Sequence, residues 1–343
     1  MNARRLASVV GATALALAAS MTSCKGSPAG TVVTMPEGAP GIGFDDLRYS
    51  AALHRVLVPG GRSGRLDLVD PDTLEVTSIS GFGATSDYSG GHDDGPTAVE
   101  VAVGRVYVTD RTTRKLVVVD PTTRAIVGDV PLAAQPDYVR FVAATRELWV
   151  TEPGASQLEI FRVGDDGVPV HDAVVAVTNG PESIVIDETR GRAYTHHWQS
   201  STMAIDVHTR AVVAEWPNGC AASRGIALDE ARGWLFSGCN EGTAAVLDVA
   251  HDGKILSTIA RGSGFDVIGY SPKLGHLYLA GASCSCLVML GVGAGGVLTF
   301  LDRFDAPSST HCATADDDGH AWVCDPDGGR LLRIDDTHPS SLP

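Results

Sequence analysis

Two stretches of the chain, ESIVIDETRGRAYT at residues 182–195 and RGIALDEARGWLFS at residues 224–237, share one pattern. Each begins with a short run of alternating apolar residues, passes through a polar turn that contains Gly, and continues into a second alternating run. Such a pattern is typical of a β-hairpin with one buried face. A third run follows and ends in an apolar residue and Asp, as at Ile205-Asp206 and Leu247-Asp248, before a turn leads into a fourth. The unit is therefore predicted to be a sheet of four antiparallel strands.

The unit recurs along the chain, and this recurrence decides the architecture. Aligning the first runs places equivalent strand starts at Asp45, Thr97, Asp137, Glu182, Arg224, Asp266 and His311. Repeats of about 40 to 50 residues with four strands each are the signature of β-propeller blades. We therefore predict an all-β fold, a single seven-bladed β-propeller of four-stranded antiparallel blades over residues 31–343. The last repeat has room for only three strands, so residues 31–34 are expected to supply the fourth and close the ring.

The spacing between the first two strand starts is 52 residues, whereas the later spacings range from 40 to 45. The excess is interpreted as an insertion at residues 78–96, SISGFGATSDYSGGHDDGP. Long loops on a rigid scaffold often carry function. This loop precedes the first strand of blade two and could fold over the mouth of the central channel. A mobile surface loop is the alternative.

Three further segments extend the pattern: RVYVTD at residues 105–110, VDPTT at residues 119–123 and ELWVTE at residues 147–152. They resemble the YVTN/YncE-type repeats of exported bacterial β-propellers, and the resemblance covers about residues 40–336. It implies the propeller fold. It implies no particular activity, because these repeat residues occupy turn and core positions.

Acidic residues outnumber basic ones, with 41 Asp and Glu against 26 Lys and Arg, for a formal net charge of −15. Binding to nucleic acid depends largely on cations that neutralise phosphates, so we expect no nucleic-acid partner. Hydrophobic residues make up 44% of the chain, which is enough for a folded core. The 39 Gly, the 18 Pro and the low charged fraction of 20% favour short strands and tight turns over long helices.

Residues 1–23 are predicted to be a lipoprotein signal peptide. Arg4 and Arg5 precede an apolar run at residues 6–19, which is too short to span a bilayer comfortably. The following Met-Thr-Ser-Cys resembles a bacterial lipobox, in which the cysteine, here Cys24, becomes the acylated first residue of the mature protein. Residues 24–30 would then form a flexible tether to a membrane of the bacterial cell envelope. The alternative is ordinary cleavage nearby and a soluble secreted protein.

Export favours disulfides among the six remaining cysteines. Cys312 and Cys324 lie symmetrically about Asp318 in a hairpin, so an antiparallel register places them opposite each other. Cys220 and Cys239 bracket the matching hairpin of blade five and form the second predicted pair.

The remaining two cysteines, Cys284 and Cys286, are harder to assign. They share one face of a strand, and a bond between them demands a bent backbone. A strained direct pair and a cross-blade partner both stay open, and so does the alternative that all six cysteines are buried free thiols.

In a propeller the inner strand of each blade lines the central channel, so equivalent positions form a ring. None of the seven strand starts is apolar, and four of them are carboxylates: Asp45, Asp137, Glu182 and Asp266. Converging oxygen donors suit a hard cation, so calcium is a candidate. Arg224 argues partly against a metal, because its guanidinium would pair with a carboxylate or hold an anionic ligand. Thr97 and His311 complete the ring. The alternative interpretation is that all seven residues are polar only because strand starts at the channel mouth are exposed to solvent.

Histidines give a second set of candidates. His92 and Asp93 lie in the insertion, and His196 and His197 end the second strand of blade four. Adjacent strand residues point to opposite faces, so the last two cannot both face one metal without a bulge. Their spacing matches no zinc motif.

The sequence contains no G-x-S-x-G elbow, no phosphate-binding Gly loop and no C-x-x-C pair. We therefore predict a monomeric, lipid-anchored binding or scaffold module with a small-molecule, glycan or protein ligand at the channel mouth. The alternative is a metal-dependent hydrolase or lyase resembling propeller lactonases, in which channel carboxylates hold a cation and His311 or His197 acts as base. The Trp residues are interpreted as blade packing rather than as docking sites for a quinone cofactor.

Overall fold

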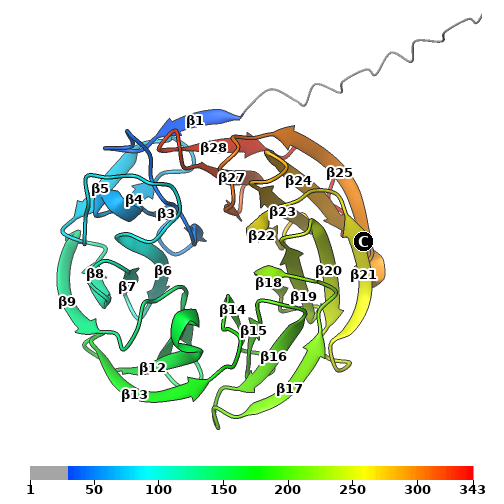
Figure 1. Cartoon of the computed structure of the whole chain (residues 1–343), viewed down its shortest axis with the longest axis horizontal. Helices are drawn as coiled ribbons and strands as arrows, with labels where there is room; N and C mark the ends of the chain where they lie inside the picture. Colours follow the sequence, from blue (N-terminus) through cyan, green and yellow to red (C-terminus); the bar gives the residue numbers. More distant parts are fainter. Residues whose placement is uncertain (1–29, 343) are drawn as a thin grey trace, which may run out of the picture.

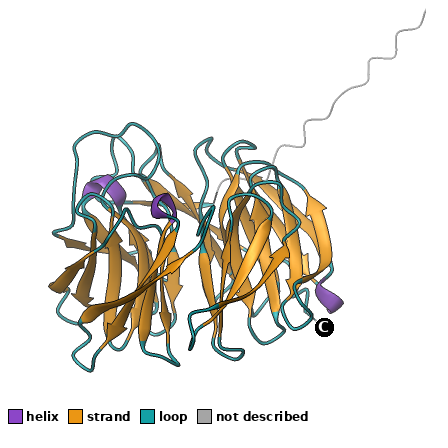
Figure 2. Ribbon diagram, turned by 60° about the horizontal axis from the view of Figure 1, so that its bottom comes forward, coloured by secondary structure: helices purple, strands orange, loops and turns teal. Residues whose placement is uncertain are grey.

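The computed structural model describes residues 30–342, so the predicted signal peptide and the lipid-attachment residue Cys24 lie outside the described residues. Seven sheets of four antiparallel strands surround a central axis (Figure 1). The predicted all-β, seven-bladed propeller is thereby confirmed. Figure 2 shows the strands from the side, with the connecting loops gathered at the two faces of the ring.

The blades follow one another in chain order, and each begins with its innermost strand. Blade one contains β2 (Arg48–Ser50), β3 (Arg55–Pro59), β4 (Arg65–Val69) and β5 (Val76–Ser80). Blade two contains β6 (Pro96–Ala102), β7 (Arg105–Asp110), β8 (Lys115–Asp120) and β9 (Ala125–Pro131). Blade three contains β10 (Val139–Val142), β11 (Glu147–Glu152), β12 (Gln157–Val163) and β13 (Pro169–Ala176).

The second half of the ring repeats this plan. Blade four contains β14 (Ile184–Asp187), β15 (Arg192–His196), β16 (Ser201–Asp206) and β17 (Val212–Pro217). Blade five contains β18 (Ser223–Asp229), β19 (Trp234–Cys239), β20 (Thr243–Asp248) and β21 (Lys254–Ala260). Blade six contains β22 (Phe265–Ser271), β23 (His276–Gly281), β24 (Cys286–Val292) and β25 (Leu298–Asp305). Blade seven contains β26 (Ala313–Ala315), β27 (His320–Asp325), β28 (Arg330–Asp335) and β1 (Thr31–Thr34).

The only helices in residues 30–342 are three short turns of 3-10 helix: η1 (Gly61–Ser63), η2 (Pro153–Ala155) and η3 (Ala294–Gly296). In the described part of the chain, no helix is long and apolar enough to cross a membrane.

The N-terminal strand closes the ring, as predicted. β1 pairs antiparallel with β28, from Thr31 opposite Arg333 to Thr34 opposite Arg330. Val33 in its middle points inward and is buried. Three strands of blade seven come from the C-terminal end of the chain, and the outermost strand comes from the N-terminal end. This pairing removes an open sheet edge.

Burial along the strands explains their composition. The third strand of blade two, β8, is buried at its four central positions because both of its faces pack against neighbouring blades. Its neighbour β9 is the outer strand, and its side chains alternate between exposed and half-buried. A continuous apolar run therefore marks a middle strand and alternation marks an outer one.

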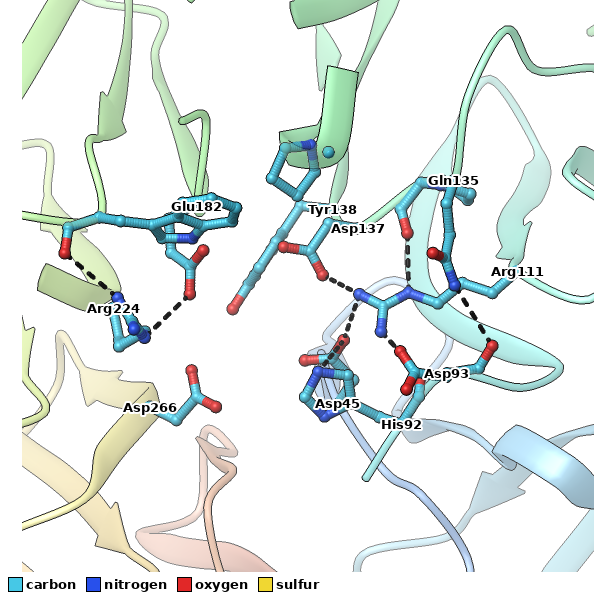
Figure 3. Close-up of a pocket in the computed structure, with 14 residues that line it drawn as sticks. Asp45, His92, Asp93, Arg111, Gln135, Asp137, Tyr138, Glu182, Arg224 and Asp266 are labelled. Atoms are coloured by element: carbon cyan, nitrogen blue, oxygen red, sulfur yellow. Dashed lines mark hydrogen bonds and ion pairs between the residues drawn. The ribbon is translucent and has the colours of Figure 1, made fainter. Parts of the chain in front are cut away.

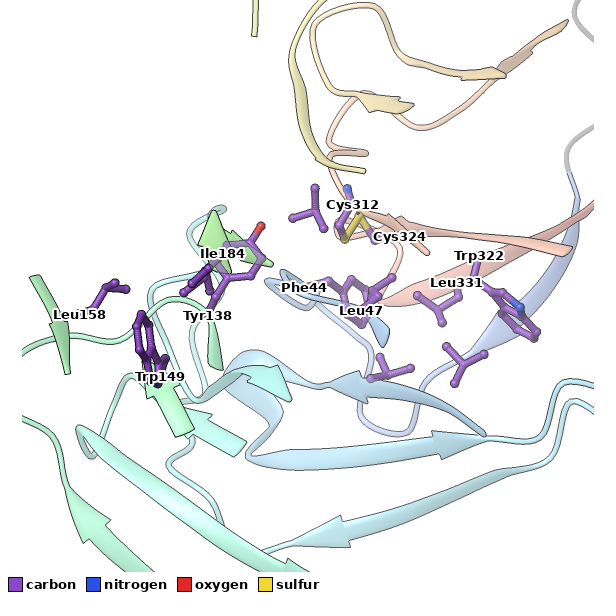
Figure 4. Close-up of a cluster of buried hydrophobic side chains, with 14 of the residues drawn as sticks. Phe44, Leu47, Tyr138, Trp149, Leu158, Ile184, Cys312, Trp322, Cys324 and Leu331 are labelled. Atoms are coloured by element: carbon purple, nitrogen blue, oxygen red, sulfur yellow. Dashed lines mark hydrogen bonds between the residues drawn. A yellow bond between two sulfur atoms is a disulfide. The ribbon is translucent and has the colours of Figure 1, made fainter. Parts of the chain in front are cut away.

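Two of the five tryptophans, Trp149 on β11 and Trp322 on β27, are fully buried between blades, as Figure 4 shows. Their indole nitrogens donate hydrogen bonds to Glu147 and Asp316, so their packing role is as expected. Trp198 departs from that interpretation, because its side chain is 41% exposed.

The insertion after blade one is narrower than predicted. Val76–Ser80 forms the regular outer strand β5, and Ser80 pairs with Arg65 across the sheet. The alternating sequence VTSIS continues the strand to its full length, so the loop itself covers only residues 81–95. Pro96 already belongs to β6.

Three disulfides are present among the described residues. Cys312 faces Cys324 across the first hairpin of blade seven, with their Cα atoms 5.6 Å apart, and Cys220 joins Cys239. The partner of Cys284, which the sequence left open, is Cys286: the two form a direct disulfide with Cα atoms 5.2 Å apart. Ser285 between them has a positive φ of 47°, which supplies the bend that such a short loop requires.

Candidate functional site

The strand starts meet at one mouth of the channel, around a cavity of about 360 Å³ (Figure 3). Five of the seven ring positions line it: Asp45, Asp137, Glu182, Arg224 and Asp266. Further lining residues include His92 and Asp93 from the loop, and Arg111, Gln135, Tyr138 and Trp198. A cavity of this size is in the range of small-molecule sites in proteins, which is about 300–1,000 Å³.

Propeller geometry explains this convergence. Asp45 lies three residues before β2, and Asp137 and Glu182 each lie two residues before the inner strands β10 and β14. Arg224 and Asp266 are the second residues of β18 and β22. Each side chain therefore enters the channel where its blade begins.

Tyr138 forms the floor of the cavity. Its side chain is 5% exposed, and Figure 3 shows its hydroxyl pointing toward the centre of the pocket. The same residue also lines a second cavity of about 250 Å³ further along the inner strands. There Arg140 makes a bidentate pair with Asp46, at 2.7 and 2.8 Å, and its guanidinium lies 5.2 Å from the Tyr138 ring centroid. Tyr138 thus separates the two halves of the channel.

Two ring positions do not face the cavity as expected. Thr97 is fully buried, and its hydroxyl lies 3.3 Å from that of Thr109 within blade two. A register shift between Pro96 and Ala98 turns it away from the axis.

His311 lies behind the cavity wall. Its Nδ1 is 2.8 Å from the carbonyl oxygen of Ser309 and its Nε2 is 2.8 Å from that of Phe44. Both ring nitrogens therefore face carbonyl oxygens of the protein, and His311 does not line the cavity.

The histidines of blade four also lie away from the cavity. His196 is fully buried, with Nδ1 2.8 Å from the hydroxyl of Thr202, and burial lowers its pKa to about 3. His197 points elsewhere, with Nδ1 3.7 Å from a carboxylate oxygen of Glu215. The two imidazoles therefore do not share a site.

The loop at residues 81–95 brings His92 to the mouth. Its ring centroid lies 5.4 Å from that of His311, and its Nε2 lies 4.0 Å from Oδ2 of Asp45. Burial, and then repulsion by Arg111, lowers the pKa of His92, so the neutral imidazole is favoured. Nη1 of Arg111 donates a hydrogen bond to the His92 carbonyl at 2.7 Å, which holds the loop in place.

Arg111 is the central residue that the sequence interpretation missed. It follows β7 directly, and its guanidinium pairs with Asp137 and lies 3.3 Å from Asp45. Pro153 has the same position after β11 and also lines the cavity. The position directly after a second strand is the sequence signal that these two residues share.

Three carboxyl groups of the cavity, Asp45, Asp137 and Glu182, have raised pKa values. Burial raises the pKa of Asp45 to about 7, partly offset by Arg111. Burial raises the pKa of Asp137 as well, against the influence of Arg111. For Glu182, burial comes first and repulsion by Asp137 and Asp266 follows, and the pKa rises to about 9. The pocket therefore gains electrostatic energy from any cation that enters it.

Two carboxylates lack donors. Oδ2 of Asp45 is buried and accepts no hydrogen bond, although Arg111 lies nearby. Figure 3 draws no hydrogen bond or ion pair to the Asp266 carboxylate, which faces the centre of the pocket. Asp266 is half-buried and open to the cavity, so its carboxylate oxygens are available to a ligand that donates hydrogen bonds.

The carboxylates do not form a compact metal cage. Within residues 30–342, three groups of potential ligands have their ligating atoms within 4.8 Å of one another, and none contains a carboxylate of this cavity. Two of these groups consist largely of cysteines that form disulfides, and the third is the surface set His54, Asp72 and Asp318. Calcium binding thus remains a prediction that the side-chain positions do not favour.

Comparison with known proteins supports the fold alone. No protein-family model matches the chain, and no curated protein matches it. A chain in a crystal structure of the mitotic checkpoint complex is 13% identical, with a TM-score of 0.72 over 98% of this chain and 100% of that one. Virginiamycin B lyase from Staphylococcus aureus is 12% identical, with a TM-score of 0.67 over 88% and 97%. Hydrazine synthase from Kuenenia stuttgartiensis is also 12% identical, with a TM-score of 0.69 over 87% and 96%.

Proposed function

We propose that this protein is a ligand-binding module of the bacterial cell envelope, with its binding site at the mouth of the channel. The observation that carries the proposal is the Asp266 carboxylate, which faces a preformed cavity and has no hydrogen-bond or ion-pair partner among the described residues. Because seven blades and the pairing of β1 with β28 hold the cavity rigid, little ordering is needed on binding.

The lining favours binding over covalent catalysis. Among the residues described around the cavity there is no Ser, Thr, Cys or Lys, so a nucleophile at this site would have to be a carboxylate, His92 or Tyr138. Its polar groups are carboxylates, guanidinium groups, one imidazole, one amide and one phenol. Such a set recognises a polar ligand by charge and hydrogen bonds.

The location in the envelope is the second half of the proposal. The apolar run at residues 6–19 and the lipobox-like residues before Cys24 support export and acylation. Three disulfides are typical of an oxidising compartment. Membership of the YVTN/YncE-type propellers would agree with export and with acylation. Residues 24–30 would then be the flexible linker between the lipid anchor and the propeller.

Native mass spectrometry with a small-molecule library tests the binding role without assuming a ligand class. The library contains cationic, neutral and anionic compounds in equal number. We expect one-to-one adducts with the parent protein that Glu182→Ala and Asp266→Ala lose, whereas Asp165→Ala, in an exposed loop, retains them. A parent protein that forms no adduct with any compound, or variants that bind like the parent, would contradict the proposal.

One observation favours a second candidate, a hydrolase or lyase. His92 is an imidazole beside the carboxylate of Asp45, and its lowered pKa leaves it neutral and able to accept a proton. In this version His92 replaces His311 and His197 as the base. Turnover of a lactone or ester panel that His92→Gln abolishes, while adduct formation persists, would establish this candidate.

A further inference from the structure

The charge of the cavity indicates what kind of ligand it takes, an inference that rests on the proposed binding role. Two guanidinium groups, those of Arg111 and Arg224, face five carboxylates: Asp45, Asp93, Asp137, Glu182 and Asp266. The acidic groups are in excess even before the net negative charge of the whole protein is considered.

Both arginines are already occupied by the protein. Nε of Arg111 donates to the Pro136 carbonyl at 2.8 Å, and its other nitrogens contact the His92 carbonyl and two carboxylates. Arg224 contacts Glu182 at 3.4 Å and donates to the carbonyls of Ser223 and Trp198. Arg111 is therefore committed to protein acceptors, and Arg224 is committed through two of its three nitrogens, Nε and Nη1.

The cavity has free acceptors among its carboxylates. The Asp266 carboxylate faces the pocket and has no hydrogen-bond or ion-pair partner among the described residues (Figure 3). Asp45 accepts no hydrogen bond, and its one close cation is Arg111, 3.3 Å from Oδ2. The Tyr138 hydroxyl points to the same centre. A ligand that supplies several N–H donors would satisfy these atoms, whereas a carboxylate or phosphate would add acceptors beside acceptors.

The size and walls of the cavity point to an organic cation rather than a metal ion. The volume of about 360 Å³ far exceeds what one metal ion needs, and the carboxylate oxygens do not approach within a common coordination sphere. Two aromatic side chains complete the lining: Trp198, which is half-exposed, and Tyr138, which is buried. Aromatic faces attract organic ammonium and guanidinium groups.

We propose that the ligand of this pocket carries a compact organic cation, a primary ammonium or a guanidinium group, which donates hydrogen bonds to Asp45 and Asp266. Glu182 lines the same cavity and adds a third carboxylate. Burial raises the pKa values of Asp45 and Glu182, so binding of a cation beside them releases protons and strengthens as the pH rises. The other charged or titratable groups that face the bound cation are Asp93, Asp137, His92, Arg111, Arg224 and Tyr138.

Isothermal titration calorimetry with four-carbon probes tests the charge assignment. Putrescine and agmatine are the cationic probes. Butane-1,4-diol and succinate have the same number of carbon atoms and are the neutral and anionic controls, and calcium chloride is the metal control. All titrations use the full-length protein in low salt at pH 6, 7 and 8.5. The variant is Asp266→Asn, which keeps the side-chain shape, and its matched control is Asp165→Asn in an exposed loop.

We expect putrescine and agmatine to bind with an affinity that rises with pH and falls about tenfold or more in Asp266→Asn, because charged hydrogen bonds are lost. Asp165→Asn should bind like the parent. Equal binding of butane-1,4-diol or succinate would overturn the cationic assignment and leave the binding role intact. Stoichiometric calcium binding that Asp266→Asn abolishes would overturn it in favour of a metal site. Failure of both cations to bind the parent would overturn it as well, and the library of mixed charge then decides whether the pocket binds any ligand.

Discussion

The guanidinium of Arg111 lies between two buried carboxylates, 3.3 Å from Oδ2 of Asp45 on one side and paired with Asp137 on the other. Asp45 precedes blade one, Arg111 follows the second strand of blade two, and Asp137 precedes blade three. One side chain thus ties three consecutive blades together at the channel mouth. Arg111 does not contact the Asp266 carboxylate, which faces the pocket without a partner and is the feature that suggests a ligand.

Replacing Arg111 by Met should destabilise the protein by about 3 to 5 kcal/mol at pH 8, because two carboxylates lose their buried counter-charge. The loss should shrink at pH 5, where the raised pKa values of Asp45 and Asp137 allow both groups to become neutral. Urea unfolding at the two pH values measures the difference. Arg124→Met, at an exposed turn, serves as the control, and an equal loss at both pH values would contradict the electrostatic account.

The Glu182 carboxyl should make the unliganded protein less stable as pH rises. Its folded pKa, raised to about 9, exceeds the unfolded value of about 4.3, so the folded state binds more protons between these limits. Glu182→Gln removes this titration. The stability of the variant relative to the parent should therefore increase by at least about 1 kcal/mol from pH 5 to pH 9. A relative stability that stays constant or falls over that range would show that the carboxyl is not perturbed.

The disulfide between Cys312 and Cys324 should contribute about 3 kcal/mol, because it closes a loop of 12 residues in the unfolded chain. The double change Cys312→Ala and Cys324→Ala tests the magnitude by urea unfolding under oxidising conditions. Non-reducing peptide mapping of the parent tests the pairing. Free alkylation of either cysteine, or a link to another cysteine, would refute it.

Cys24→Ala should move the protein from the membrane fraction to the soluble fraction of the cells that export it. The apolar run at residues 6–19 would still direct export, but the lipid attachment point would be lost. Fractionation with metabolic labelling by a fatty-acid analogue measures both effects. An unlabelled parent, or a variant that still partitions to membranes, would argue for a secreted protein instead.

The sequence alone predicted the number of blades, the strand order and the closing strand, because alternation and turn residues repeat with a regular spacing. It also placed five polar side chains at the channel mouth: Asp45, Asp137, Glu182, Arg224 and Asp266. Each of these follows from propeller geometry, in which equivalent positions face the same axis.

The remaining details depend on contacts that no repeat pattern encodes. The register shift next to Thr97 turns that residue into its blade, and a backbone carbonyl from Phe44 occupies one nitrogen of His311. Arg111 was missed because it lies at the end of a second strand, whereas the alignment considered only the first. A loop of irregular sequence brings His92 to the mouth, where a hydrogen bond from Arg111 holds it.

A crystal structure of the protein grown with putrescine at pH 8.5 tests the central claim most directly. The account predicts density for the diamine in the cavity above Tyr138, with an ammonium nitrogen at about 2.7–3.0 Å from carboxylate oxygens of Asp45 and Asp266. Density at the other end of the channel beside Arg140, or a cavity that holds only water at saturating diamine, would contradict it.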